Sequence, residues 1–296
     1  MTKFGYYSRL FQNLGVPRYS EVINLLIAGE HDFYEKYARG FKGGEKIGSG
    51  KTNSFRYKFD GFQFVIREEI EDDRISYSIL NNDAAKSICM LIFIPKDDNY
   101  AYIDNISYHP QRAVNGMPKT SGGTLMLKVT LDFIENDLKD RYKLKYMSLK
   151  DNSYFYCDQV GGTIDLDSLY MLTRGNTWYG KYGFVPFDSE KVMIDYDMLV
   201  EYKLNQRLVD IIPLGCTQIE EYILVALNDP KFRMVISKKR IKETLEMYKQ
   251  FPIKKFFKDF LEKYDKTCGV FAVIYKNVMR DVGMRNLHGV SYYKLL

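Results

Sequence analysis

Apolar residues along the chain change their spacing near residue 54 and again near residue 110. Residues 18–40 carry them at the spacing of one helix face, with Ser20 able to cap a helix and Gly29 able to end it. From Phe55 onward apolar and polar residues alternate, which is typical of half-buried strands. Asp60-Gly61 interrupts this alternation, and that dipeptide favours a two-residue hairpin turn. We therefore expect an N-terminal helix followed by an antiparallel meander.

The strands predicted in this meander are Phe55–Phe59, Phe62–Arg67, Arg74–Leu80, Ser87–Ile94 and Tyr100–Tyr108. Helical spacing returns after Pro110 and predicts a helix over Leu125–Leu138. The later predicted elements are the strand Tyr146–Leu149, the helix Leu166–Tyr179, the strands Phe184–Phe187 and Val192–Tyr196, and the helices Lys238–Gln250, Pro252–Tyr264 and Phe271–Arg280. This order predicts an α+β fold with a mixed, mostly antiparallel sheet flanked by helices and with a helical C-terminal extension.

Composition agrees with a folded protein that contains a sheet. Hydrophobic residues make up 46% of the 296 positions and charged residues 27%, while 25 Tyr and 19 Phe favour half-buried strands. The formal charge of +5 permits contact with nucleic acid or ligand phosphates but argues for neither. No run approaches the ~20 apolar residues of a membrane span, and a secretory signal is not recognisable. We expect a cytoplasmic protein without membrane contact, and the frequent Lys, Asn, Ile and Tyr resemble usage in proteins of large DNA viruses.

The cysteines and histidines give little sign of a metal site. Cys89, Cys157, Cys216 and Cys268 lie far apart and form no Cys-x-x-Cys pair, so reduced structural thiols are expected. The histidines are His31, His109 and His288. Because this set is so small, a His/Cys zinc site is not expected and no metal is predicted.

One segment joins a predicted strand, a glycine-bearing turn and an amphipathic helix. Lys119-Thr-Ser-Gly-Gly-Thr124 follows the strand that ends near Pro110 and precedes the helix that begins at Leu125. Gly122-Gly123 allows a ligand to approach the backbone closely, and the first amides of the helix favour an anion. A diphosphate is the natural ligand, and Lys119 and Arg112 add positive charge.

This turn resembles the pyrophosphate-binding turn of the GNAT family of acetyl-CoA-dependent N-acetyltransferases, which reads Arg/Gln-x-x-Gly-x-Gly/Ala. Lys119-x-x-Gly122-x-Thr124 is similar to it, with Lys in place of Arg/Gln and Thr in place of the last small residue. A second family signature, roughly Leu-Tyr-Glu-Lys-Leu-Gly-Phe, is similar to Trp178-Tyr-Gly-Lys-Tyr-Gly-Phe184. The two occur in the family's order, and the resemblance covers about residues 55–200.

The resemblance implies direct transfer of acetyl from acetyl-CoA to an amine acceptor. The backbone of the strand near Ile106 and Tyr108 would pair with the pantetheine arm. Tyr179 would protonate the leaving thiolate, and Asp104 would accept the proton of the amine through water. The cofactor-binding residues implied are Ile106, Tyr108, Lys119, Ser121, Gly122, Gly123 and Thr124.

The expected domains are a helical lead and loop over residues 1–54, an acetyltransferase-like domain over 55–200 and a helical extension over 201–296. Two segments exceed the family's usual length, Gln111–Pro118 and Asn152–Asp165, and both would flank the active site. They leave open a catalytically silent fold that serves as a structural or interaction module.

Two other motifs carry weaker alternatives. Gly50-Lys51-Thr52 is similar to the end of a P-loop, but a hairpin rather than a helix is predicted after it, so we reject that function. The run Ser237–Lys266 holds ten Lys/Arg against five Asp/Glu and would allow contact with nucleic acid or an acidic protein. Its aromatic residues are spaced as a helix core would require, which favours an ordinary solvated face.

Overall fold

The computed structural model describes residues 51–80, 88–106, 122–157, 160, 162–229, 232, 237–263 and 268–296. The expected helix over 18–40 and the site residues Tyr108, Lys119 and Ser121 lie outside these residues. The chain divides into two compact units. We call the described residues of 51–150 with 291–296 the sheet unit, and those of 151–290 the helical unit.

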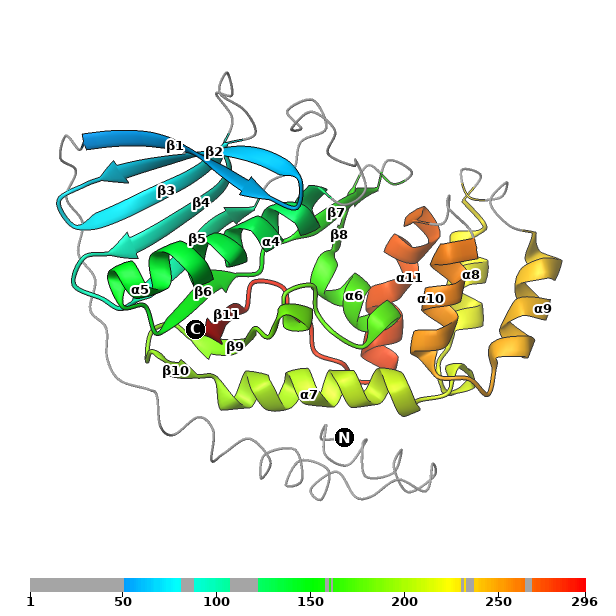
Figure 1. Ribbon diagram of the computed structural model, residues 1–296. Coiled ribbons are helices and arrows are strands. Elements are labelled where there is room, and N and C mark those ends of the chain that lie inside the picture. The colour runs from blue at the N-terminus through cyan, green and yellow to red at the C-terminus, as the bar shows by residue number, and fades with distance from the viewer. Residues whose placement is uncertain are drawn as a thin grey trace. The chain divides into compact units, whose positions relative to one another are not determined.

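The sheet unit is built on one large, mostly antiparallel sheet (Figure 1). Its strands are β1 (Lys51–Phe59), β2 (Phe62–Ile70), β3 (Arg74–Leu80), β4 (Ile88–Pro95), β5 (Tyr100–Ile106), β6 (Tyr146–Lys150) and β11 (Ser291–Leu295). They lie in the order β1-β2-β3-β4-β5-β6-β11, and the pair β5–β6 is parallel while the other neighbours are antiparallel. The predicted α+β class and the predicted meander are confirmed.

The β1–β2 hairpin follows from its turn residues. Asp60 has φ 48° and Gly61 has φ 78°, so both central residues adopt the left-handed backbone that a type I′ turn requires. Phe59 then pairs directly with Phe62. Lys51 and Thr52 belong to strand β1, whereas a P-loop would lead into a helix, so this part of the structure agrees with the rejection of that motif.

Helix α4 (Gly122–Phe133) lies across one face of the sheet (Figure 1). It passes into a π-helical turn, η2 (Ile134–Leu138), and the short helix α5 (Lys139–Tyr142). Phe133 is buried against Tyr57 and Tyr77, with ring centroids 5.3 and 5.4 Å away. The predicted helix over Leu125–Leu138 is therefore found, although it begins earlier, at Gly122.

The helical unit contains the remaining elements. They are β7 (Tyr154–Cys157), β8 (Gly162–Asp165), α6 (Leu166–Arg174), η3 (Gly180–Tyr182), β9 (Val185–Asp188), β10 (Met193–Ile194), α7 (Tyr196–Ile211), η4 (Leu214–Cys216), α8 (Ile219–Ala226), α9 (Lys238–Tyr248), α10 (Ile253–Lys263) and α11 (Cys268–Asp281). Ser237 caps α9 by accepting a hydrogen bond from the amide of Arg240 at 3.3 Å, as the sequence predicts. The helix predicted over Leu166–Tyr179 ends earlier than expected, because Gly175 adopts a left-handed conformation, φ 71°, directly after Arg174.

Aromatic side chains form much of the core of the helical unit. Helix α10 packs against α6 and α7, and α11 packs against α8. Phe257 of α10 contacts Phe271 of α11 with ring centroids 5.5 Å apart, and Phe271 stacks on Tyr275 at 5.3 Å. Phe256, Phe257 and Phe260 are buried, which confirms a role in the helix core for these three aromatic residues of the basic run, whereas Phe251 is exposed.

Two features differ from the expectations for the C-terminal third of the chain. Residues Ser291–Leu295 form a strand that pairs with β6, so the extension over 201–296 is not wholly helical. Because that strand belongs to the sheet unit, the units divide after Lys150 and after Val290, and the expected domain over 55–200 includes parts of both. The local sequence pattern does not predict the pairing of β11 with β6, because these strands are far apart in sequence.

The expectation that every cysteine is reduced was wrong. Cys157 at the end of β7 and Cys268 at the start of α11 form a disulfide, with Cα atoms 5.9 Å apart and a sequence separation of 111. The pairing could not be predicted from the sequence, because it depends on the fold bringing two distant cysteines close together. Cys89 is buried and Cys216 is exposed, and both are thiols.

Among the described residues, no helix combines the length and the apolar content that crossing a membrane requires.

Candidate functional site

The carboxyl ends of β5 and β6 lie beside each other in the sheet unit, and β5 ends at Ile106, one of the predicted cofactor-binding residues. Their parallel ladder runs from the pair Tyr100–Tyr146 to the pair Ile103–Leu149, whereas β5 itself continues to Ile106. The connection between these strands contains α4. Ligands of sheets with parallel strands commonly bind outside the carboxyl ends of two such strands.

Asp104, the predicted general base, lies at an irregularity in β5. Leu91 of β4 pairs with Asn105 and the next residue, Ile92, pairs with Ile103, so Asp104 is the inserted residue of a β-bulge. Its side chain is exposed. A bulge redirects a side chain and commonly lies near a functional site. The structure therefore gives Asp104 an unusual backbone position immediately after the last β5–β6 pair.

The predicted diphosphate-binding residues Gly122, Gly123 and Thr124 form the first turn of α4. Gly122 is buried and the other two are half-buried. This turn holds no acidic residue. The first amides of a helix have no partner within it and carry its positive dipole end, so the turn is electrostatically suited to an anion. Ile106, at the end of β5, belongs to the same unit.

Tyr179, the predicted general acid, lies in the helical unit within an aromatic cluster. Its side chain is 5% exposed, and its ring lies 4.9 Å from that of Trp178 and 6.0 Å from that of Phe184. It directly precedes η3, which Gly183 ends with φ 88°. A packing role thus accounts for much of this motif.

Steric crowding explains why position 180 is a glycine. A Cβ at this position would overlap the hydroxyl of Tyr202 and the side-chain oxygen of Asn176, which are hydrogen-bonded to each other. The backbone amide of Gly180 donates a hydrogen bond to the hydroxyl of Thr177 at 3.0 Å, which a proline at this position could not do. The second signature is therefore a compact turn in which packing requires Gly180 and a left-handed backbone favours glycine at position 183.

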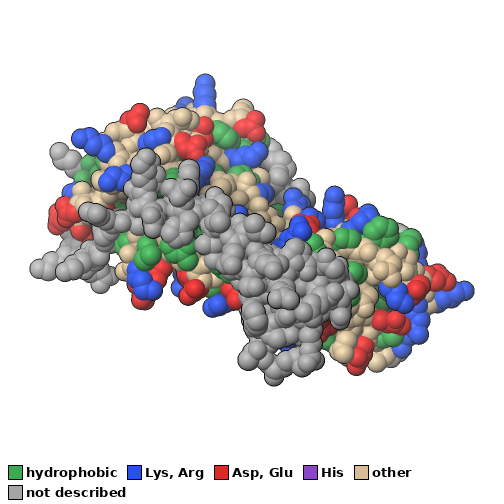
Figure 2. Space-filling model, turned by 90° about the horizontal axis from the view of Figure 1, so that it is seen from below, with side chains coloured by type: hydrophobic (Ala, Val, Ile, Leu, Met, Phe, Trp, Pro, Cys, Tyr) green, Lys and Arg blue, Asp and Glu red, His purple; other side chains and the backbone are tan. Residues whose placement is uncertain are grey.

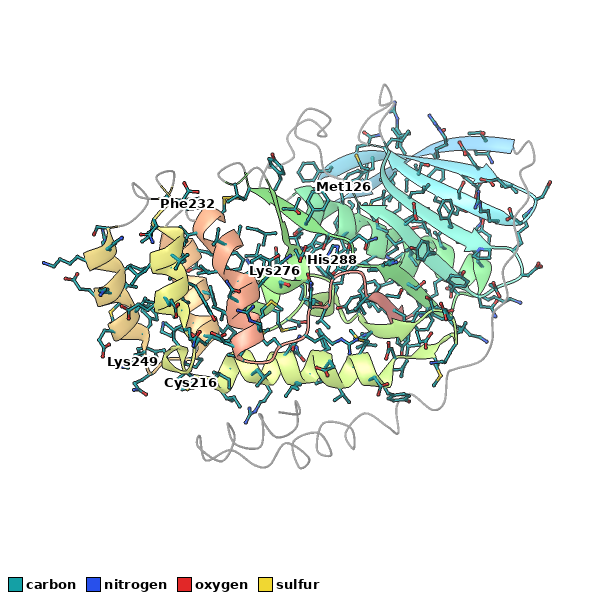
Figure 3. The ribbon with its side chains drawn as sticks, turned by 180° about the vertical axis from the view of Figure 1, so that it is seen from behind. Met126, Cys216, Phe232, Lys249, Lys276 and His288 are labelled. Atoms are coloured by element: carbon teal, nitrogen blue, oxygen red, sulfur yellow. A yellow bond between two sulfur atoms is a disulfide. The ribbon has the colours of Figure 1, made fainter. Side chains whose placement is uncertain are left out.

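The sequence pattern did not predict a cluster of side chains in the helical unit that could ligate a metal ion. Asp165, Asp167 and His288 each offer one ligand atom, and these atoms all lie within 4.8 Å of one another. Figure 3 labels His288 and Lys276, two of the residues that contact Asp165 from outside the β7–β8 hairpin. The signal available in the sequence was the spacing Asp165-Leu-Asp167 at the start of α6, which a search for His/Cys pairs does not detect.

Asp151 is a further buried acid that interacts electrostatically with this cluster. It is 0% exposed, and its Oδ1 accepts hydrogen bonds from the amide of Ser153 at 3.0 Å and from the Ser153 hydroxyl. Burial raises the pKa of Asp151 to about 6, the charge of Asp167 adds to the increase, and His288 opposes it. Burial and the charge of Asp165 likewise raise the pKa of Asp167.

The basic run around α9 and α10 is partly neutralised by acidic neighbours. The ion pairs are Lys242 with Glu220, Lys249 with Glu246, Lys254 with Asp210 and Lys255 with Asp259. In Figure 2, Lys and Arg side chains at the right of the view are interspersed with Asp and Glu side chains. A contact with nucleic acid or an acidic protein stays a prediction.

Comparison of the chain with protein-family models, with curated proteins and with solved structures gave no match.

Proposed function

We propose that the chain is an acetyl-CoA-dependent N-acetyltransferase of the GNAT type. The observation that carries this proposal is the end of the parallel β5–β6 pairing at Ile103–Leu149, where a β-bulge at Asp104 follows directly. The connection from β5 to β6 contains helix α4, which begins with two glycines. Together with the ordered sequence motifs, this geometry favours a ligand that has both an anionic and an extended part.

Coenzyme A has both parts. Its diphosphate would accept hydrogen bonds from the amides of Gly122, Gly123 and Thr124. Its pantetheine arm would lie along β5 near Ile106 and pair with the backbone as an added strand. The side chains of Lys119 and Ser121 and the backbone of Tyr108 belong to the same proposed site.

The proposed reaction is a direct acyl transfer. The acceptor amine attacks the thioester carbonyl, the new C–N bond forms, and the C–S bond breaks to release a thiolate. Asp104 would accept the amine's proton through water, and Tyr179 would supply a proton to the thiolate. A cytoplasmic location belongs to this proposal, although a disulfide is more common in oxidising compartments.

A second candidate is a catalytically silent fold that serves as an interaction module. The burial of Tyr179 between Trp178 and Phe184 favours it, because packing against these two rings gives that side chain a structural role.

Thermal unfolding with and without acetyl-CoA tests the proposal. Ligand at 100 times its dissociation constant would stabilise the wild-type chain by about 2.7 kcal/mol. Gly123→Val should abolish this shift, because a branched side chain obstructs the diphosphate. Lys128→Gln is the matched control, since Lys128 is exposed on the same helix outside its first turn.

Equal shifts in wild type and Gly123→Val would place any coenzyme elsewhere, and no shift in the wild type would contradict the proposal. A shift without acetyl transfer to a broad panel of amines would instead favour the silent fold.

A further inference from the structure

We propose that Asp165, Asp167 and His288 bind a divalent cation of the first transition series, such as Mn²⁺ or Zn²⁺. This function is independent of the coenzyme site proposed above. The three ligand atoms already lie within 4.8 Å of one another, and Nδ1 of His288 is 3.7 Å from Oδ1 of Asp165. Ligands bonded to a metal at about 2.1 Å stand roughly 3–3.5 Å apart. The exposed side chain of His288 can close that difference by a small rotation.

Unpartnered buried oxygens are the second observation that points to an ion. Asp167 is 1% exposed, and its Oδ1 has no hydrogen-bond partner in the described part of the chain. Oδ2 of Asp151 is in the same condition. A buried carboxylate oxygen that no donor satisfies is costly. A cation bound by the cluster would satisfy the Asp167 oxygen and would offset the negative charge of Asp151, which interacts electrostatically with Asp167.

The opposite oxygens of these carboxylates are held in place. Oδ2 of Asp167 accepts the amide of Leu287 at 3.0 Å and the hydroxyl of Ser168 at 3.3 Å. Oδ2 of Asp165 accepts the hydroxyl of Tyr275 at 3.1 Å. Outer hydrogen bonds of this kind orient metal ligands. The bond to Leu287 also fixes the residue immediately before His288, which brings the histidine to the two acids.

The types of ligand decide the class of ion. Ca²⁺ and Mg²⁺ prefer sites made wholly of oxygen atoms. Imidazole nitrogen combined with carboxylate oxygen suits Zn²⁺ and other first-row transition ions. A set of two aspartates and one histidine therefore favours Mn²⁺ or Zn²⁺ over the alkaline-earth ions.

A groove of about 420 Å³ shares residues with the surroundings of the cluster. Tyr275 and Lys276 line it, and both also contact Asp165. Ser168 and Asn286 line it as well, next in sequence to Asp167 and Leu287. The groove therefore lies next to the residues that surround the cluster, although none of the three proposed ligands lines it.

Isothermal titration of the full, chelator-treated chain with Mn²⁺ or Zn²⁺ tests the proposal, with no coenzyme present. The wild type should bind one ion at this site. His288→Gln and Asp167→Asn should each weaken binding by more than about 10-fold. Asp197→Asn should not change it, because Asp197 is an exposed acid on the first turn of α7.

Replacing Lys276 should have the opposite effect on the affinity for the ion. Its Nζ lies 3.9 Å from Oδ2 of Asp165 and its side chain is mostly exposed, so it competes weakly with the ion. Lys276→Met should tighten binding by a few-fold at low salt.

Failure of the wild type to bind either ion would overturn the proposal, as would unchanged binding in a folded His288→Gln variant. Circular dichroism establishes the folded state, and because His288 is exposed its replacement should leave the fold intact. Since no step involves acetyl-CoA, this outcome is separate from the fate of the proposed transferase function.

Discussion

Cys157 and Cys268 are joined by a disulfide that spans 111 residues of sequence. Cys157 ends β7, whose partner strand β8 ends at Asp165, and Cys268 begins α11, which carries Tyr275. The bond therefore connects the two segments whose side chains meet in the hydrogen bond between Tyr275 and Asp165.

Replacing both cysteines, Cys157→Ser with Cys268→Ser, should lower the free energy of unfolding by about 2–5 kcal/mol. A cross-link over so long a loop removes much conformational freedom from the unfolded chain. Urea denaturation measures the difference. Cys216→Ser is the control, because Cys216 is an exposed thiol. If reductant leaves the wild-type midpoint unchanged, the bond contributes no stability and this prediction fails.

Glu68 makes the stability of the sheet unit dependent on pH. It is 5% exposed, and its side chain accepts hydrogen bonds from Tyr77 at 2.5 Å and from Asn53 at 3.1 Å. It also forms an ion pair with Arg141 at 2.9 Å. Burial alone would raise the pKa of Glu68, but the hydrogen bonds from Tyr77 and Asn53 and the charge of Arg141 together lower this pKa below its ordinary value. A carboxyl whose pKa is lower in the folded state contributes stability above its unfolded pKa.

This contribution should be lost as the pH falls below about 4.5 and through the lower pKa of the folded state. Glu68→Gln should therefore be less stable at pH 7 by about 1–3 kcal/mol and should show a shallower loss of stability in acid. Denaturation over a pH series gives both quantities. Parallel pH profiles for wild type and variant would show that Glu68 does not carry this dependence.

Elements whose determinants are adjacent in sequence could be predicted. Asp60-Gly61 specifies its hairpin and Ser237 specifies the start of α9, because each acts on a backbone within three residues. The pairing of β11 with β6 could not be predicted in this way, since its partners are more than a hundred residues apart.

The two candidate sites also differ in whether their residues are close together in the sequence. Gly122 was recognisable because the strand, the glycines and the helix are continuous in sequence. The acid–histidine cluster was not, because a hydrogen bond between Asp167 and Leu287 assembles it across 120 residues. Helix α6 was predicted too long because the apolar spacing continues past Gly175, where the left-handed backbone ends the helix.

Gly180→Ala should destabilise the helical unit by about 1–3 kcal/mol. The new methyl group would overlap the oxygens of Tyr202 and Asn176 and would force their hydrogen bond apart. Gly162→Ala is the matched control, because its Cβ would lie 3.8 Å from Val160, an ordinary contact. Thermal unfolding compares the two variants, and equal melting temperatures would mean that the turn at Gly180 relaxes without cost.

Tyr179→Phe separates catalysis from packing. The variant keeps the ring that packs against Trp178 and Phe184 and removes one hydroxyl, so its melting temperature should change little. If Tyr179 protonates the leaving thiolate, acetyl transfer should slow by ~100-fold or more, which corresponds to roughly 2.7 kcal/mol in the barrier. Tyr182→Phe, within the same turn, should leave the rate unchanged. Binding of acetyl-CoA, measured by the thermal shift, should be equal in all three proteins, because the hydroxyl is assigned to the reaction and not to the diphosphate site. A Tyr179→Phe variant that transfers acetyl at the wild-type rate would remove Tyr179 from the mechanism and leave packing as its role.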